Sequence, residues 1–542
     1  MKHLRWMGTL GIAAVWGVSA WASPFGRGVN ILGYDPIWKS PEQARFRAEH
    51  MRAIREAGFQ HVRVNLHPFH HMGPDLTLSS QWWNTLDWVV GVATSNGLAV
   101  VLDCHEFQAM GRDLDANRPR FLAFWRQMAE RLRDAPDSVA FELLNEPHGQ
   151  LTPARWNELL VEALSIVRAQ QPNRTVVLGP AQWNSVDGLA ALQLPENDRH
   201  IVLTIHYYEP MDFTHQGAAW AGRKEKVGVA WNGLPEEVAR IEQDFDRVAA
   251  WASARGRPVY LGEFGVYDAA PMESRTRYLS AVARAAERRG WSWAYWQFDS
   301  DFVVWDMARN QWVEPVLRAL IPPPIRVLVT YGGHGFQQRE FWAMWDSFAD
   351  MRYTRCELPR EADLLRPGPE QRWDVIVRYD MVADLSPEHR EALIAQLRAG
   401  VGLVSLHHNF AAHPTWEEYV TIRGGAYILK PRTVRGMDLP ASWYAHDQDV
   451  RVTIADREHP ITRGLKDYTI HDEVYGGCYI APSVHVLLTT DHPRSMSALA
   501  WTTSYERARV VFLQHGHDAK AWEHPMFREI LQRSIRWAAG QL

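Results

Sequence analysis

Two glutamates follow apolar runs that are typical of buried strands. The run FELL (141–144) is followed by Asn145 and Glu146, and the run that starts at Pro258 ends in Glu263. A carboxylic acid can protonate a leaving oxygen, while a second carboxylate attacks carbon or activates water. If both glutamates line one cleft, their chemistry is that of glycoside hydrolysis.

The elements that must position these residues alternate between short apolar runs and amphipathic stretches. Eight candidate strands are RGVNIL from 27, HVRVN from 61, LAVVLDC from 98, SVAFELL from 138, RTVVLG from 174, IVLTIH from 201, PVYLGE from 258 and WSWAYWQ from 291. Candidate helices span 41–57, 81–95, 153–171, 235–254 and 273–289. This alternation implies parallel strands, and eight of them predict a (β/α)8 TIM barrel over residues 23–320.

Further polar residues lie near the carboxyl ends of these strands, where such a barrel builds its active site. They are Asn30, Arg63, Asn65, Asp103, His105, Asn145, His206, Tyr208, Trp296 and Gln297. Polar groups in such places are costly unless they are paired or used. Amide, imidazole, phenol and guanidinium groups around two carboxylates meet the needs of a glycosidase.

The motifs RGVN, HVRVN, VLDCHEF, ELLNEP, HYY and GEFG occur in this order on the expected strands. Together they resemble glycoside hydrolase family 5, a family of retaining (β/α)8 glycosidases, over roughly residues 25–318. The resemblance implies that Glu146 is the general acid/base and Glu263 the nucleophile. It also implies double displacement, with the carboxyl groups about 5 Å apart.

The same resemblance assigns supporting roles. Asn145 would hold the sugar 2-hydroxyl, Arg63 and Tyr208 would bond Glu263, and Arg63 would help to keep Glu263 ionised. The other implied cleft residues are His105, His206 near the acid/base, and Trp296 as the sugar platform. Further subsite candidates, for which packing under loops is the alternative, are Trp38, Trp183, Trp220 and Tyr34.

The substrate is expected to be a β-linked polysaccharide or oligosaccharide, and no cofactor is expected. Segment 209–222, EPMDFTHQGAAWAG, is similar to segments of bacterial cellulases and favours β-1,4-glucan with endoglucanase-like action. β-Mannan and β-1,3-glucan are alternative substrates. Transglycosylation, and sugar binding with little turnover, are alternative functions. The net charge of −5 gives no basic patch, so nucleic acid is not an expected partner.

A proline-rich linker, IPPPI (321–325), precedes a second predicted domain over residues 326–542. Its candidate strands are RVLVTY from 326, WDVIVR from 373, VGLVSL from 401, VHVLL from 484 and RVVFLQ from 509. Candidate helices span 387–399 and 525–539. The pattern predicts an open, flavodoxin-like α/β sheet.

Several histidines and acids follow strand ends or begin loops of this second domain, where open α/β sheets bind ligands. The candidates are His334, His407, His408, Asp472, Glu473, His515, His517 and Asp518. Imidazole and carboxylate suit a metal ion, which is one interpretation of this set. No spacing among them is diagnostic of a metal site, so the prediction is no metal.

The motifs HPITRGL, DEVY, ALAWTTSYERARVVFLQHGHD and IRWAAG lie between residues 325 and 540. They resemble the ThuA-like trehalose-utilisation family, whose fold is similar to class I glutamine amidotransferases. In amidotransferases the turn after the VGLVSL-like strand holds a nucleophilic cysteine. Here that turn reads LHHN, so glutaminase chemistry is not expected. Fusion to a glycosidase favours a carbohydrate role.

The N-terminus has the pattern of a signal peptide. Lys2 and Arg5 precede the apolar stretch Trp6–Val18, and Ala20-Trp21-Ala22 matches a cleavage site. We therefore expect cleavage near Ala22 and a secreted or periplasmic protein with no membrane span in the mature chain. An uncleaved anchor is the alternative.

The chain contains three cysteines, Cys104, Cys356 and Cys478. An odd number leaves at least one thiol unpaired. A bridge between Cys356 and Cys478 is left open by the sequence.

Overall fold

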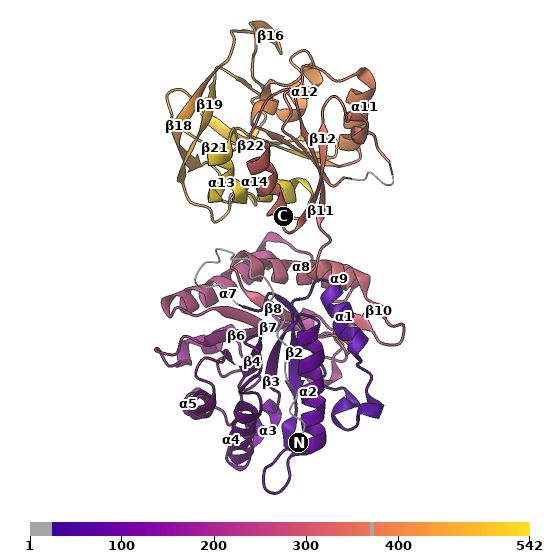
Figure 1. The fold of residues 1–542 in the computed structure, drawn as a ribbon, viewed down its shortest axis with the longest axis vertical. Coiled ribbons are helices and arrows are strands. Elements are labelled where there is room, and N and C mark those ends of the chain that lie inside the picture. The colour runs from indigo at the N-terminus through magenta and orange to yellow at the C-terminus, as the bar shows by residue number, and fades with distance from the viewer. Residues whose placement is uncertain (1–23, 369–372) are drawn as a thin grey trace. The chain divides into compact units, whose positions relative to one another are not determined.

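The computed structural model describes residues 24–368 and 373–542 (Figure 1). The chain divides into two compact units between Pro322 and Pro323. The predicted signal peptide, with its cleavage near Ala22, lies outside the described residues. Within the described ranges, no helix has the length and apolarity needed to cross a membrane.

The first unit is a closed barrel of eight parallel strands, which confirms the predicted (β/α)8 fold. Hydrogen bonding follows chain order, and the last strand pairs with the first. The strands are β1 (Arg27–Ile31), β2 (His61–Leu66), β3 (Ala99–Cys104), β4 (Val139–Glu142), β5 (Val176–Leu178), β6 (Ile201–Tyr207), β7 (Val259–Phe264) and β8 (Ser292–Tyr295). Each lies within or beside a predicted run.

Helices surround the barrel (Figure 1). They are α1 (Ala48–Glu56), α2 (Ser80–Ser95), α3 (Phe107–Arg112), α4 (Leu114–Arg131), α5 (Pro153–Gln170), α6 (Met211–Thr214), α7 (Pro235–Ala254), α8 (Met272–Arg288) and α9 (Glu314–Leu320). Helix α4 was not predicted, because Pro119 interrupts its pattern. Its later turns bury Phe121, Phe124, Trp125 and Met128, which follow the helical period.

Side-chain alternation along β2 explains how polar groups enter the barrel. Val62 and Val64 pack in the large core shared with the helices. His61 and Arg63 point to the other side, where His61 bonds Tyr260 at 3.0 Å. Because strand side chains alternate between faces, the same strand supplies outer packing and inner polar groups.

The second unit contains a nine-stranded sheet, in the order β12-β11-β13-β14-β23-β22-β21-β18-β19. Its parallel strands are β11 (Ile325–Tyr331), β12 (Met351–Glu357), β13 (Val375–Arg378), β14 (Gly402–Leu406) and β23 (Ala508–Leu513). Their order is flavodoxin-like, as predicted. The antiparallel strands β18 (Trp443–Ile454), β19 (Tyr468–Gly476), β21 (His485–Thr489) and β22 (Ala498–Tyr505) extend the sheet.

Helices cover both faces of this sheet. Alternate residues of β11 divide between two apolar clusters: Val327 packs with α10 (Gln338–Asp346) and α14 (Pro525–Ala538), while Leu328 packs with α11 (Pro387–Arg398) and α12 (Glu417–Arg423). The short helix α13 (Ala519–Glu523) joins the first of these clusters.

Short two-stranded sheets complete the two units. Two are hairpins, β9 (Trp305–Asp306) with β10 (Gln311–Trp312) and β16 (Arg432–Val434) with β17 (Met437–Leu439). A further two-stranded antiparallel sheet pairs β15 (Gly425–Ala426) with β20 (Tyr479–Ile480), which are distant in sequence. All three cysteines are free thiols, so the bridge between Cys356 and Cys478 that the sequence left open is not formed.

Candidate active site

Glu263, near the end of β7, is held through both carboxylate oxygens. Arg63 Nη1 donates to its Oε1 at 2.6 Å, and the Tyr208 hydroxyl donates to its Oε2 at 3.0 Å. Burial raises the pKa of Glu263 to about 7, while the charges of His206 and Arg63 oppose that rise. Donors on both oxygens favour the ionised form.

Glu146 follows β4 in a different environment. Its backbone φ is +40°, a left-handed conformation that is uncommon for a residue with a side chain and is found at functional sites. His206 Nδ1 lies 2.8 Å from its Oε1, and the side chain is 17% exposed. Burial raises the pKa of Glu146 to about 7.

The two glutamates face each other across His206. One carboxylate oxygen of each, and a ring nitrogen of His206, all lie within 4.8 Å of one another. His206 Nδ1 is also 3.6 Å from Glu263 Oε2. Such a short separation matches a carboxylate pair that acts without a water molecule between its members.

Arg63 is the hub of the buried network beneath this pair. Its Nε and Nη2 donate to the carboxylate of Glu142 at 2.7 and 2.8 Å. Nη2 also donates to Asn145 Oδ1 at 2.9 Å and lies 3.1 Å from Asp103 Oδ2. The role of Glu142 was not predicted from the sequence. The signal that could have indicated it is a charged residue inside the apolar run FELL.

His105 and Trp296 form a stacked pair at the strand ends. Their ring centroids are 5.5 Å apart with an interplanar angle of 8°. His105 Nδ1 lies 2.6 Å from Asp103 Oδ2, and burial holds the pKa of His105 well below its usual range. One face of Trp296 is therefore covered, and 8% of the residue is exposed.

The subsite candidates differ in exposure. Trp183 is 54% exposed and stacks on His148 at 4.9 Å, while Tyr34 and Trp220 are 61% and 63% exposed. Trp38 is 7% exposed and stacks on Trp82. The ring of Trp38 contributes to core packing, which was the alternative stated for it, and its sugar-binding role stays a prediction.

The second-unit candidates divide among separate contacts. His407, Glu473 and His517 come together. Asp472 accepts from the backbone of Gly516 at 2.7 Å and lies 3.2 Å from His515 Nδ1.

The remaining candidates have other partners. Asp518 caps α13, His408 Nε2 lies 2.5 Å from the carbonyl oxygen of Tyr379, and the ring of His334 lies 4.6 Å from that of His408. The second-unit candidates are thus a group of three with neighbours around it.

Comparison with known families matches both units. The model of cellulase (glycosyl hydrolase family 5) matches residues 22–301, more than half of the 542-residue chain. The model of trehalose utilisation (ThuA) matches residues 365–538.

Curated relatives match the first unit. Endoglucanase H of Acetivibrio thermocellus is 28% identical over 278 residues, which are 50% of this chain and 30% of that protein. Cellodextrinase A of Ruminococcus flavefaciens is 27% identical over 288 residues, covering 49% of this chain and 82% of its own length. The chain thus spans less than a third of the first relative and most of the second.

Solved structures agree with this match. Endoglucanase Cel5A of Thermotoga maritima is 39% identical with a TM-score of 0.52, over 55% of this chain and 97% of that one. Cellulose synthase subunit Z of Clostridioides difficile is 33% identical with the same TM-score, over 55% of this chain and 100% of that one. The chain therefore belongs to glycosyl hydrolase family 5, the cellulase family.

Proposed function

We propose that the first unit is a retaining endoglucanase that cleaves β-1,4-glucan, with Glu263 as nucleophile and Glu146 as acid/base. The observation that carries this assignment is the unequal bonding of two close carboxylates. Arg63 and Tyr208 donate to Glu263, whereas among the described residues only the His206 nitrogen lies within hydrogen-bond distance of the Glu146 carboxylate. Burial raises the pKa of both groups to about 7, but the donors on Glu263 favour its anion, whereas Glu146 is free to carry a proton.

In the first step, the Glu263 carboxylate attacks the anomeric carbon. The glycosidic C–O bond breaks, and the Glu146 proton goes to the leaving oxygen, so a covalent glycosyl ester forms on Glu263. In the second step, water gives a proton to Glu146 and attacks the same carbon, and Glu263 leaves as a carboxylate. Two inversions give net retention.

Neighbouring groups would hold the sugar. Arg63 fixes the amide oxygen of Asn145, which leaves the amide nitrogen to donate to the sugar 2-hydroxyl. Trp296 would offer the ring face that His105 does not cover. Exposed Trp183 and Tyr34 would extend the binding surface to further sugar units.

The names of the relatives support β-1,4-glucan. One structural relative, 34% identical with a TM-score of 0.52, is a hyperthermophilic endo-β-1,4-glucanase in complex with substrate. Cel5A of Thermotoga maritima has been solved with cellobiose and with mannotriose. Mannan is therefore the competing substrate that a test must include.

The test compares wild type with Glu146→Ala and Glu263→Ala on soluble β-glucan, mannan and β-1,3-glucan, with Glu162→Gln, a partly exposed surface residue, as the matched control. We expect turnover of β-1,4-glucan to mid-length products in wild type and control, and its loss in both alanine variants. Added azide should give an α-glycosyl azide with Glu263→Ala and a β-glycosyl azide with Glu146→Ala. The opposite pairing would reverse the assigned roles.

A fluorosugar distinguishes an enzyme from a protein that only binds sugar. A 2-deoxy-2-fluoro β-glycoside with a good leaving group should leave a covalent adduct on Glu263, seen by peptide mass spectrometry. Polymer binding in a gel-shift assay with neither adduct nor products would favour a sugar-binding protein. Longer oligosaccharides at high acceptor concentration would favour a transglycosylase.

We also propose that the protein is exported, with cleavage after Ala22 and mature domains over residues 23–320 and 326–542. The charged start, apolar stretch and small residues at the cleavage site support export. N-terminal sequencing of the exported protein should begin at Ser23. An intact Met1 in the membrane fraction would favour an uncleaved anchor.

A further inference from the structure

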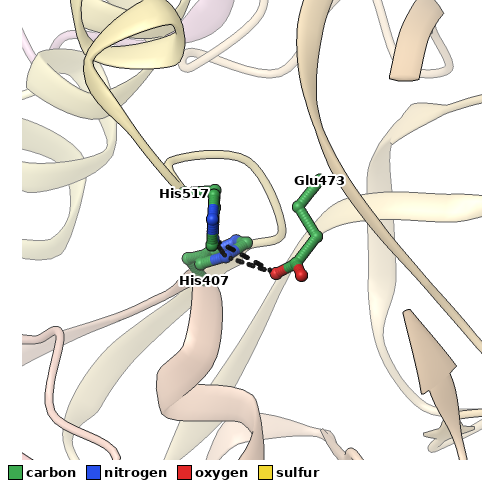
Figure 2. Close-up of side chains that lie close together, drawn as sticks. All are labelled: His407, Glu473 and His517. Carbon is green, nitrogen blue, oxygen red and sulfur yellow. Dashed lines mark hydrogen bonds and ion pairs between the residues drawn. The ribbon is translucent and has the colours of Figure 1, made fainter. Parts of the chain in front are cut away.

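Three potential ligand atoms converge in the second unit, as Figure 2 shows. His407 Nε2 lies 3.0 Å from Glu473 Oε2 and 3.1 Å from His517 Nδ1. The third edge, from His517 Nδ1 to Glu473 Oε2, is 3.3 Å. The residues come from the end of β14, from β19 and from the loop after β23, so the fold brings distant segments to one point.

The tautomer of His407 makes this convergence unusual. Its Nδ1 lies 2.6 Å from the carbonyl oxygen of Gln514, which can only accept, so Nδ1 carries the hydrogen. With the hydrogen on Nδ1, Nε2 presents a lone pair to a carboxylate oxygen of Glu473 unless a second proton is bound there. Two lone pairs 3.0 Å apart repel each other unless a proton or a cation lies between them.

A second layer of contacts orients these groups. His446 Nδ1 lies 3.1 Å from Oε1 of Glu473, which leaves Oε2 for the convergence point. The backbone N–H of His517 donates to Asp472 at 3.1 Å. These two are outer contacts of the kind that fix ligand orientation in metal sites. The Tyr475 hydroxyl is different, because it lies 2.9 Å from His407 Nε2 itself and so borders the convergence point.

Burial and backbone conformation also distinguish the point where these three side chains converge. The side chains of His407, Glu473 and His517 are 0%, 7% and 22% exposed, so the point is open on one side. His407 has φ +50°, a strained conformation directly after a strand. Within the described residues, Nδ1 of the buried neighbour His408 has no hydrogen-bond partner.

We propose that His407 Nε2, Glu473 Oε2 and His517 Nδ1 bind one divalent transition-metal ion, with Zn²⁺ the best match. Two imidazoles and one carboxylate form a ligand set of catalytic zinc sites, which keep a further position open. Ligand atoms bound at about 2.0–2.2 Å to one ion lie roughly 3.0–3.5 Å apart, as these three do. This replaces the sequence-based prediction of no metal.

The test uses the full chain, stripped with a chelator, dialysed and titrated with Co²⁺ and with Zn²⁺ near pH 7. We expect one Co²⁺ per chain with a visible ligand-field spectrum, competed by Zn²⁺. Glu473→Gln and His517→Ala should abolish that spectrum. His446→Ala, which removes only an outer contact, should weaken binding by about 10–100-fold.

Two controls locate the ion. His485→Gln alters a surface histidine–carboxylate pair of the same unit and should bind Co²⁺ as wild type does. Glu263→Gln removes a carboxylate from the other convergent set, Glu146, His206 and Glu263, and should also leave binding unchanged. Loss of the spectrum in Glu263→Gln would assign the ion to the first unit and overturn the proposal.

Folding defects are separated from ligand loss by circular dichroism and thermal melting of each stripped variant. Glu473→Gln is nearly isosteric, and His517 is partly exposed, so both are expected to fold. Zn²⁺ should raise the melting temperature of wild type and not that of Glu473→Gln. A folded wild type that binds no Co²⁺ would mean that a shared proton, and not a metal, holds the three groups together.

Discussion

Arg63 donates a hydrogen bond of 2.6 Å to Glu263, the proposed nucleophile, from a guanidinium that is completely buried. The same cation bonds Glu142 twice and lies against Asp103. One positive charge therefore serves three buried carboxylates. An unpaired buried charge destabilises a fold. Arg63 therefore stabilises both the buried carboxylates of the barrel interior and the ionised form of Glu263.

Replacing Arg63 with Met should destabilise the first unit by about 3–5 kcal/mol, because it leaves buried carboxylates without their cation. Urea unfolding followed by tryptophan fluorescence measures this. The control is Arg27→Met, which removes a partly exposed pair with Glu287 and should cost at most about 1 kcal/mol. Equal losses in both variants would mean that the buried network contributes no more than a surface pair.

The activity should show a bell-shaped dependence on pH. Burial raises the pKa values of Glu146 and Glu263 to about 7, so both limbs are expected near neutrality. The rising limb reports ionisation of Glu263, and the falling limb reports loss of the Glu146 proton. The measured quantity is kcat/KM from pH 4 to pH 9.

Tyr208→Phe should shift one limb of the pH profile and not the other. The hydroxyl donates to the charged form of Glu263, so its removal should raise the pKa of Glu263 and move the rising limb to higher pH. The falling limb should stay in place. If the rising limb does not move, Glu263 is not the group that must ionise.

The barrel and its two central carboxylates were predictable from the sequence. The barrel strands are buried, so in the sequence they are apolar runs with polar residues at their ends. The pair of Arg63 with Glu142 was harder to predict, since the two residues lie on β2 and β4, which the fold brings together through their shared neighbour β3. Strand β18 was missed because its surface residues, such as Trp443 and Tyr444, obscure the apolar alternation.

Exposure of aromatic residues was not predictable. Trp38 and Trp183 both lie in segments that follow a barrel strand, after β1 and after β5, yet one is 7% and the other 54% exposed. The difference arises from contacts between segments distant in sequence, such as Trp38 with Trp82. The convergence of His407, Glu473 and His517 has the same origin, because no sequence spacing links its members.

Trp183 should bind a sugar unit beyond the cleavage point. Its exposed ring stacks on His148, whose Nδ1 lies 2.8 Å from the carbonyl oxygen of Glu146. Trp183→Ala should raise KM on long cello-oligosaccharides several-fold, with little effect on an aryl cellobioside and none on thermal stability. Trp38→Ala, the buried counterpart, should instead lower stability by about 3–5 kcal/mol. A uniform loss of kcat in Trp183→Ala would indicate a role at the reacting carbons.

The thiols should stay reduced and unreactive in the folded protein. Cys104 and Cys356 are buried and Cys478 is half-buried, and burial raises the pKa values of Cys356 and Cys478 to about 12. Because the thiolate is the reactive form, a disulfide reagent at pH 8 should label native protein slowly and label three thiols after unfolding without reductant. Reductant should leave the melting temperature unchanged. A single thiol after unfolding would reveal a bridge in the exported protein, and the pair Cys356 and Cys478 would be the first to map.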